Sequence, residues 1–206
     1  LRQVLGWREY MWGIYWLKPE LREVNVLAHQ RQLPPSWRGE STTRMNCLAQ
    51  ALDGLEERAY VHHIQRLMVL SNFANLYGIH PVAVRDWMRA RYIDGSDWAM
   101  VPNVMGMGLW ADGGTLSTKP YVSGGAYIKK MSDYCRDCEF NPAKRVGADA
   151  CPFTTLYWDF LHRHRDQLAT NHRLARPYAN LARLRDREAT LEQAQQVKRM
   201  IGAGEM

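Results

Sequence analysis

The sequence has few cysteines and no long apolar run, and each shortage excludes a class of protein. Four cysteines among 206 residues are too few for a disulfide-stapled scaffold. No window approaches the roughly 18–20 consecutive apolar residues that a membrane-spanning helix needs, which excludes a transmembrane protein. An apolar content of 46% excludes a disordered chain, so we expect one substantial domain with its own core.

Two further features are missing, an initiating methionine and a secretory signal. The chain begins at Leu1, and its first residues already have the apolar spacing of the middle of a helix. They lack the basic stretch, the apolar stretch and the small-residue cleavage site that make up a signal peptide. We therefore expect the chain to be the C-terminal piece of a longer protein.

Strand-like alternation of polar and apolar residues is weak throughout, whereas helical spacing recurs. The Gly- and Met-rich stretch 93–125 has few helix signals, so we expect an irregular segment that is functional or mobile. Thr43 is the expected cap of the second helix, Gly78 ends the third and Gly202 stops the last. The pattern predicts an all-α protein with helices over residues 3–16, 44–58, 60–76, 81–91, 126–134, 153–169, 172–185 and 188–201.

Charge and tryptophan content leave several functions open. A formal net charge of +6 permits a polyanionic partner but does not identify one. Eight tryptophans are about three times what average composition gives a chain of this length. Such a surplus fits a bulky core, and it also suits base stacking or electron hopping.

The four cysteines could serve one metal site. Cys135 and Cys138 form a C-x2-C pair, Cys151 follows after twelve residues and precedes Pro152, and Cys47 lies far upstream. A C-x2-C pair lets two thiolates bind one metal centre from a single turn, and the other two would complete a four-thiolate shell. The Cys-Pro ending favours iron–sulfur over zinc. The spacing leaves zinc, and ordinary buried thiols, open.

Two adjacent histidines, His62 and His63, open the helix expected from Tyr60. Neighbouring side chains on a helix point about 100° apart, so these two cannot share one role. His63 and Arg66 lie on one face, and a buried arginine needs a carboxylate partner. Asp94, in the Ile-Asp-Gly turn, is the expected partner. Two solvated surface histidines are the alternative interpretation.

Several segments together resemble a known family. They are similar to the C-terminal, FAD-binding half of the iron–sulfur bacterial cryptochromes and photolyases, also called prokaryotic (6-4) photolyases. The resemblance covers nearly the whole chain but not the family's N-terminal antenna domain, where an antenna chromophore would bind. The segments that carry it are GWREYMWGIYW, TRMNCLAQAL, AYVHHIQRLMVLSNFANLYGI, YIDGSDWAMVPNVMGMGLWADGG and KPYVSGGAYIKKMSDYCRDCEF.

The resemblance implies a fold and two regions. The fold is the all-α FAD-binding domain of the cryptochrome/photolyase family. Residues 1–134 would form the helical FAD- and lesion-binding region, and residues 135–206 the iron–sulfur loop and terminal helices. Because part of the flavin pocket would precede Leu1, we expect the isolated chain to bind FAD poorly.

The resemblance also implies roles for individual residues. His63, Tyr121 and Tyr127 would act at the lesion, with Met105 and Met107 excluding water. The flavin would be contacted by His62, Arg66, Asp94, Asp97 and Asn103, and it would receive electrons through Trp87 and Trp37. The ligands of a [4Fe-4S] cluster would be Cys47, Cys135, Cys138 and Cys151.

The implied activity is light-driven reversal of (6-4) photoproducts in UV-damaged DNA by a monomer in the bacterial cytoplasm. Arg163, Arg165, Arg173 and Arg176 are candidate phosphate contacts. Two alternatives stay open: a blue-light photoreceptor of the same family, and a nucleic-acid-binding module with iron–sulfur or zinc but no flavin.

Two positions depart from the family pattern. Leu67 stands where the eukaryotic enzymes carry a further histidine, and Met88 follows Trp87, where it would break an aromatic relay.

Overall fold

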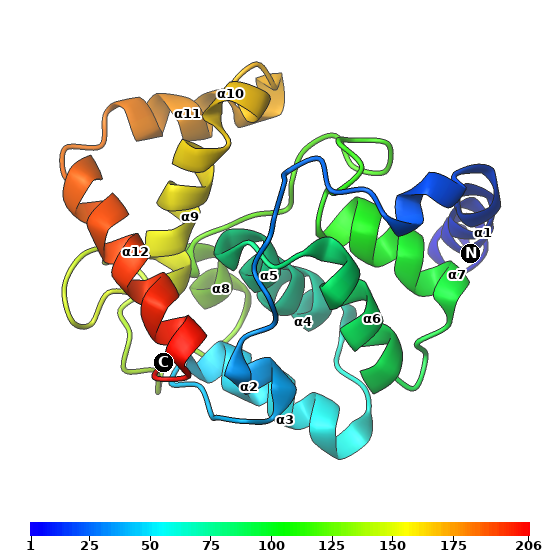
Figure 1. Ribbon diagram of the computed structural model, residues 1–206, viewed down its shortest axis with the longest axis horizontal. Coiled ribbons are helices and arrows are strands. Elements are labelled where there is room, and N and C mark those ends of the chain that lie inside the picture. Colours follow the sequence, from blue (N-terminus) through cyan, green and yellow to red (C-terminus); the bar gives the residue numbers. More distant parts are fainter.

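A computed structural model describes all 206 residues as a helical protein without strands, which confirms the predicted all-α class. Backbone bridges of the strand type occur only in isolation, at Arg31–Ile79 and Asn141–Ala150. The N-terminal helix lies at one end of the molecule, and α9 to α12 lie at the other (Figure 1). None of the helices has the length and apolar character needed to cross a membrane.

The helices follow one another with short connections, apart from the loops before α2, α8 and α9. The π-helical elements are η1 (Arg2–Trp7), η3 (Arg66–Ser71) and η4 (Val101–Gly108), and the 3-10 turns are η2 (Pro19–Arg22) and η5 (His172–Leu174). The α-helices are α1 (Arg8–Leu17), α2 (Pro35–Arg38), α3 (Asn46–Arg58), α4 (His63–Gln65), α5 (Asn72–Tyr77), α6 (Pro81–Arg91), α7 (Asp97–Met100), α8 (Gly125–Met131), α9 (Pro152–Arg163), α10 (Arg165–Leu168), α11 (Ala175–Ala182) and α12 (Arg187–Ala203).

Several predicted helix boundaries are shifted. The helix expected from Tyr60 begins at His63, the one expected to reach residue 134 ends at Met131, and the one expected over 153–169 is interrupted after Arg163. The cap of α3 is Met45, not Thr43, although the Thr43 hydroxyl accepts a hydrogen bond of 3.3 Å from the Met45 amide. Helix α12 continues through Gly202 and ends at Gly204, whose positive φ of 76° terminates it. The predicted stop at Gly78 is confirmed, since its left-handed conformation ends α5.

The prediction of an irregular segment over residues 93–125 is wrong for its first half, which forms α7 and η4. The glycines there serve close packing. A Cβ added to Gly106 would lie 2.0 Å from the Leu116 side chain, and one on Gly108 would lie 2.8 Å from the Ser71 hydroxyl oxygen. Tertiary contact thus stabilises a helix that local propensity does not favour.

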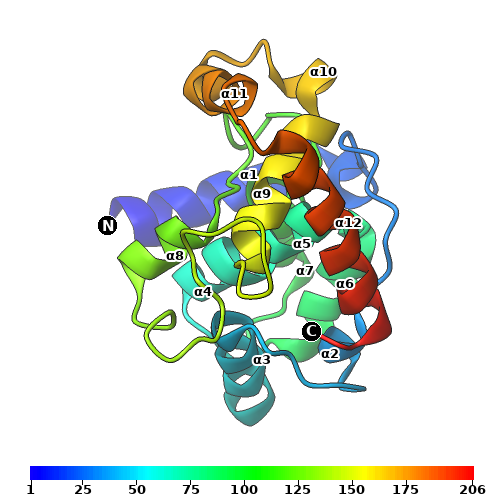
Figure 2. The same ribbon diagram turned by 90° about the vertical axis from the view of Figure 1, so that its left-hand side faces the viewer.

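One hydrophobic core of 39 buried residues joins both of the regions expected from the sequence. Helix α9 is central to it, because it packs against α12 on one side and α5 on the other (Figure 2). Phe73 of α5 and Phe153 of α9 meet with ring centroids 6.1 Å apart. The two regions therefore share one core, and a boundary near residue 134 stays a prediction.

Candidate functional site

A cavity of about 560 Å³ opens beside the N-terminal helix, and we call it the flavin cavity for the resemblance described above. Its volume lies within the range of about 300–1,000 Å³ typical of small-molecule sites. The walls are mostly apolar, with a few polar side chains converging on them. All three π-helical segments contribute to these walls, and such widened turns are frequent at functional sites.

Arg66 is the most firmly held polar side chain of this cavity. Its Nη1 lies 2.9 Å from Asp94 Oδ1, which confirms the predicted ion pair, and its Nε donates to the Val61 carbonyl at 2.9 Å. The guanidinium stacks between two rings, 4.1 Å from the centroid of Tyr92 and 4.7 Å from that of Tyr60. Its Nη2 is buried without a hydrogen-bond partner, so a donor is free for a ligand.

The two histidines have separate surroundings, but not for the predicted reason, because His62 precedes the helix as its cap and only His63 lies within it. His62 caps α4, because its Nδ1 accepts a hydrogen bond of 3.2 Å from the Ile64 amide and its own amide donates to Gln65. His63, one residue later, lines the flavin cavity. Burial lowers the pKa of His63, and the nearby Arg66 and His62 lower it further. The neutral imidazole is therefore favoured at neutral pH.

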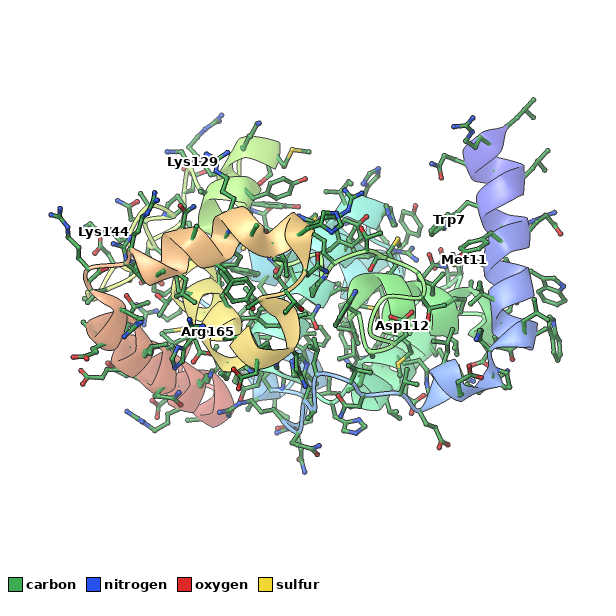
Figure 3. All side chains as sticks on the ribbon, turned by 90° about the horizontal axis from the view of Figure 1, so that it is seen from above. Trp7, Met11, Asp112, Lys129, Lys144 and Arg165 are labelled. Carbon is green, nitrogen blue, oxygen red and sulfur yellow. The ribbon has the colours of Figure 1, made fainter.

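Asn103 lines the flavin cavity, whereas Asp97 does not. Asn103 Oδ1 accepts a hydrogen bond of 3.3 Å from Trp7 Nε1, and Figure 3 shows Trp7 on the side of the N-terminal helix that faces the rest of the molecule. Asp97 accepts a hydrogen bond of 2.7 Å from the Tyr15 hydroxyl and pairs with Arg89 at 3.1 Å. These contacts tie α7 to α1 and α6.

The two candidate tyrosines do not meet. Tyr121 lines the flavin cavity with His63, but Tyr127 lines a separate pocket of about 300 Å³ together with His62. The two methionines also differ, since Met107 lines the flavin cavity while Met105 is fully buried in the core. Only Tyr121 and Met107 therefore border the space next to His63.

Trp87 and Trp37 form a contact pair inside the core. Their ring centroids are 4.4 Å apart, and Trp87 Nε1 donates to the Trp37 carbonyl at 2.7 Å. Neither ring lines the flavin cavity, but Met88 does. A thioether therefore occupies the position through which an aromatic relay from Trp87 would pass.

The four cysteines line one small cavity, which we call the cysteine cavity. They come together although Cys47 and Cys135 are 88 positions apart in the sequence. Cys47 comes from the first turn of α3, Cys135 and Cys138 from the loop after α8, and Cys151 from the residue before α9. All four thiols are free. Burial raises the pKa of Cys47, and the other three sulfurs raise it further. The predicted grouping of the four thiols is thus present.

The cysteine cavity is apolar, and the absence of a side chain at Gly125 helps to shape it. Met45, Ile128, Phe140 and Phe153 form much of its wall. A Cβ on Gly125 would lie 2.6 Å from the Cys151 sulfur, so glycine leaves that sulfur room. No group of three or more His, Cys, Asp or Glu side chains is arranged to hold a single metal ion.

The four candidate phosphate-binding arginines divide into two kinds. Arg163 is engaged by groups of the protein itself, because its Nε lies 2.7 Å from Asp159 and its Nη2 donates to the Leu76 carbonyl at 2.9 Å. Arg165, Arg173 and Arg176 are exposed on α10, η5 and α11, and Figure 3 shows Arg165 on its short helix.

Sequence reasoning missed several residues of the flavin cavity, among them Trp7, Tyr60, Ser71 and Met100. Ser71 lies five positions after Arg66, a spacing that would turn it about 140° away in an ordinary α-helix, and it reaches the same wall because the turns between them are π-helical. Tyr60 lies in a loop, where no periodicity reports the direction of a side chain. The tryptophan surplus was the one available signal for Trp7.

Comparison with known proteins agrees with this geometry. The chain is 52% identical over 186 residues to a (6-4) photolyase of Agrobacterium fabrum, a match that covers 89% of this chain and 36% of the relative. It is 36% identical over 100 residues to an uncharacterised protein of Acanthamoeba polyphaga mimivirus, covering 48% of this chain and 74% of that protein. No family model matches the chain.

The chain thus spans about a third of the length of the photolyase, 36% of it. Over that part, one residue in two is identical, and the matched stretch takes up most of the helical domain described above. The chain belongs to the photolyase/cryptochrome family.

Proposed function

We propose that this protein takes part in light-driven reversal of (6-4) pyrimidine photoproducts in DNA, with FAD in the flavin cavity and damaged DNA as its partner. One observation carries the proposal. His63, Arg66, Asn103 and Tyr121 converge on one cavity of ligand size in a chain that is 52% identical to a (6-4) photolyase.

The unpartnered Nη2 of Arg66 supports a flavin in this cavity. A buried donor without an acceptor is costly, and a flavin ring offers nitrogen and oxygen acceptors. When bound and reduced, the flavin supplies an electron to the lesion under illumination. Asp94 and the rings of Tyr60 and Tyr92 fix Arg66 in place, while Met100 and Met107 exclude water from the cavity.

His63 would donate a proton to the lesion, which must leave the duplex to reach the cavity. Protonation neutralises the negative charge that the lesion gains, and this slows the return of the electron. Tyr121, on the same cavity, would position the extruded base. Burial lowers the pKa of His63, and DNA phosphates near the cavity would raise it again.

The four cysteines would bind a [4Fe-4S] cluster. A cluster takes one thiolate on each of its irons, so its ligands lie farther apart than those of a single ion, in keeping with four thiols around one cavity that form no single-ion site. The apolar walls favour a buried cofactor over a solvated ion. The cluster would hold α3, the loop after α8 and the start of α9 together.

A chimera tests the proposed activity. This chain would replace the matching part of the Agrobacterium protein, and the product would be incubated with a duplex that contains one (6-4) photoproduct, in light and in the dark. We expect light-dependent loss of the photoproduct, which His63→Ala abolishes and His62→Ala retains at least in part. No loss in light, from a chimera that binds FAD, would contradict the repair function and favour the photoreceptor.

The flavin is tested separately by an absorption spectrum of the chimera. Flavin bands at about 370 and about 450 nm are expected of the cofactor. Their absence from a folded chimera would contradict a flavoprotein and favour a nucleic-acid-binding module without flavin.

A further inference from the structure

A fourth pocket, of about 400 Å³, is strongly polar and shares no lining residue with the flavin cavity or the cysteine cavity. It lies where the loop at residues 28–31 meets the end of α5, the end of α9 and the side of α12. Arg31, Arg163 and Lys198 bring positive charge to its wall, and Gln30 and Gln195 bring amides. None of its lining residues is an aspartate or a glutamate.

The charges at this pocket do not balance. The one carboxylate in contact with its cations is Asp159, which is buried behind the wall, and its Oδ2 lies 2.6 Å from Lys198 Nζ and 2.7 Å from Arg163 Nε. Arg31 makes no ion pair, and its guanidinium stacks 4.9 Å from the centroid of the Tyr77 ring. Three positive charges therefore face one negative charge, an excess of two.

Two buried histidines next to the pocket add no further charge. The Nε2 atoms of His29 and His164 lie 3.3 Å apart. Burial, together with the charges of His164, Arg163, His80 and Lys198, lowers the pKa of His29 to about 3. Burial is also the main cause that lowers the pKa of His164 to about 4. The two rings are therefore neutral at physiological pH, and the arginines and the lysine determine the charge of the pocket.

Lys198 is the deepest of the three cations. It is only 4% exposed, and Asp159 is its sole ion-pair partner. An ammonium group has three donors, so two N–H groups of Lys198 are left for a ligand. Leaving such donors without acceptors away from water is costly, and this favours an occupant that brings several oxygen acceptors.

We propose that this pocket binds a terminal phosphate group, carried by free phosphate or by a small phosphate monoester. A dianion matches the excess of two positive charges, and phosphate oxygens suit the planar fork of an arginine beside the point charge of a lysine. The depth of Lys198 selects a terminal phosphate, because a phosphodiester of DNA has a sugar on each side and does not reach a buried ammonium group. This site is independent of the proposed repair function.

Phosphate binding is tested with two variants that each add one negative charge, the first inside the pocket and the second just outside it. Gln195→Glu puts a carboxylate on the pocket wall, whereas Gln196→Glu makes the same change at the next, exposed position of α12, outside the pocket. Arg31→Gln removes the unpaired cation from an exposed loop position. Inorganic phosphate is titrated into each protein at constant ionic strength, and binding is followed by calorimetry and by the midpoint of thermal unfolding.

We expect phosphate to bind and to raise the unfolding temperature of the unmodified chain and of Gln196→Glu. In Gln195→Glu and Arg31→Gln, phosphate binding should weaken about tenfold or more. Without phosphate, Gln195→Glu should be more stable than the unmodified chain, because the new carboxylate offsets part of the excess positive charge. An equal response of Gln195→Glu and Gln196→Glu, or no binding by the unmodified chain, overturns the proposal. Loss of duplex DNA binding in Gln195→Glu without any response to free phosphate also overturns it and assigns the pocket to the DNA backbone.

Discussion

The flavin cavity and the cysteine cavity are built in opposite ways. The flavin cavity is large, has mixed polarity and takes its walls from widened helical turns. The cysteine cavity is small and apolar, and its defining groups are four side chains of one type from three separate places in the fold. A site that coordinates a metal centre through thiolates can be recognised in the sequence from its residue types. A site that holds its ligand in a shaped cavity cannot, because the cavity depends on the geometry of the helices around it.

The two cavities also differ in what holds them together. Around the flavin cavity, the Arg66–Asp94 ion pair and the stacked rings of Tyr60 and Tyr92 are complete without a ligand. Around the cysteine cavity, four free thiols face one another without a disulfide, and burial raises the pKa of Cys47. We therefore expect the stability of the cysteine region, but not of the flavin region, to depend on its cofactor.

The largest effect should come from Cys47→Ala. Removing the ligand on α3 should abolish the brown colour of the cluster and lower the free energy of unfolding by several kcal/mol, because metal binding and folding are coupled. Urea unfolding followed by circular dichroism measures the change. Met45→Leu, which alters the same cavity without removing a thiol, is the control and should keep the colour. An unchanged cluster content in Cys47→Ala would show that the comparison is wrong.

Adding a methyl group at Gly125 should also destabilise the cysteine region, but less than the loss of Cys47. In Gly125→Ala the added Cβ meets the Cys151 sulfur at 2.6 Å, whereas in Gly124→Ala the nearest atom, of Thr154, lies at an ordinary 3.4 Å. We expect Gly125→Ala to lower the free energy of unfolding by about 1–3 kcal/mol, as overpacking does, and to reduce iron content. Gly124→Ala should be close to the unmodified protein in both measurements, and equal losses in the two variants would argue against this role of Gly125.

The flavin cavity should respond to pH through His63. Burial lowers the pKa of this histidine, and Arg66 and His62 lower it further. If His63 is the proton donor, repair by the chimera should fall as pH rises through the pKa of His63 in the DNA complex. Arg66→Gln removes a cation and should move the midpoint to higher pH. A repair rate that is constant from pH 5 to pH 8 would remove His63 from the proton-transfer step.

The smallest effect should come from the tryptophan pair, which touches neither cofactor site directly. Trp87→Phe should slow photoreduction of the flavin several-fold without a large loss of stability, since phenylalanine retains the packing but is hard to oxidise. Trp110→Phe is the control, because both indoles are buried and donate to a backbone carbonyl. Flash photolysis of the chimera measures the rate. Equal rates in the two variants would mean that electrons reach the flavin by another route.

Some of this site was predictable from the sequence for clear physical reasons. The Arg66–Asp94 pair was found because a buried guanidinium needs a carboxylate, and the four cysteines because no other residue type substitutes for thiolate ligands. Helix α6 was found from its periodicity and from Pro81 at its start, and α12 from its periodicity, although not with its correct end. These features depend on local chemistry, which one sequence contains.

Other features depend on contacts that local chemistry does not report. Helix η4 was missed because its glycines look like loop residues until Leu116 and Ser71 are packed against them. Tyr127 and Asp97 do not line the flavin cavity, because Tyr127 borders a separate pocket and Asp97 is bonded to Tyr15 and Arg89. Matching a family's residue type at a position therefore does not fix the space that its side chain enters.

The π-helical segments make the site sensitive to the register of its backbone hydrogen bonds. In η3, the wider turn lets Arg66, Leu67 and Ser71 border one cavity. In an ordinary α-helix, side chains five positions apart point about 140° away from each other, so Arg66 and Ser71 share a wall because the turn between them is wider. A substitution that restored ordinary α-helical turns at unchanged length would rotate Ser71 off the wall while Arg66 remained. Deleting one residue as well would place the two side chains at i,i+4, again on one face. The register of the backbone hydrogen bonds in this segment is therefore as much a determinant of the site as the identities of its residues.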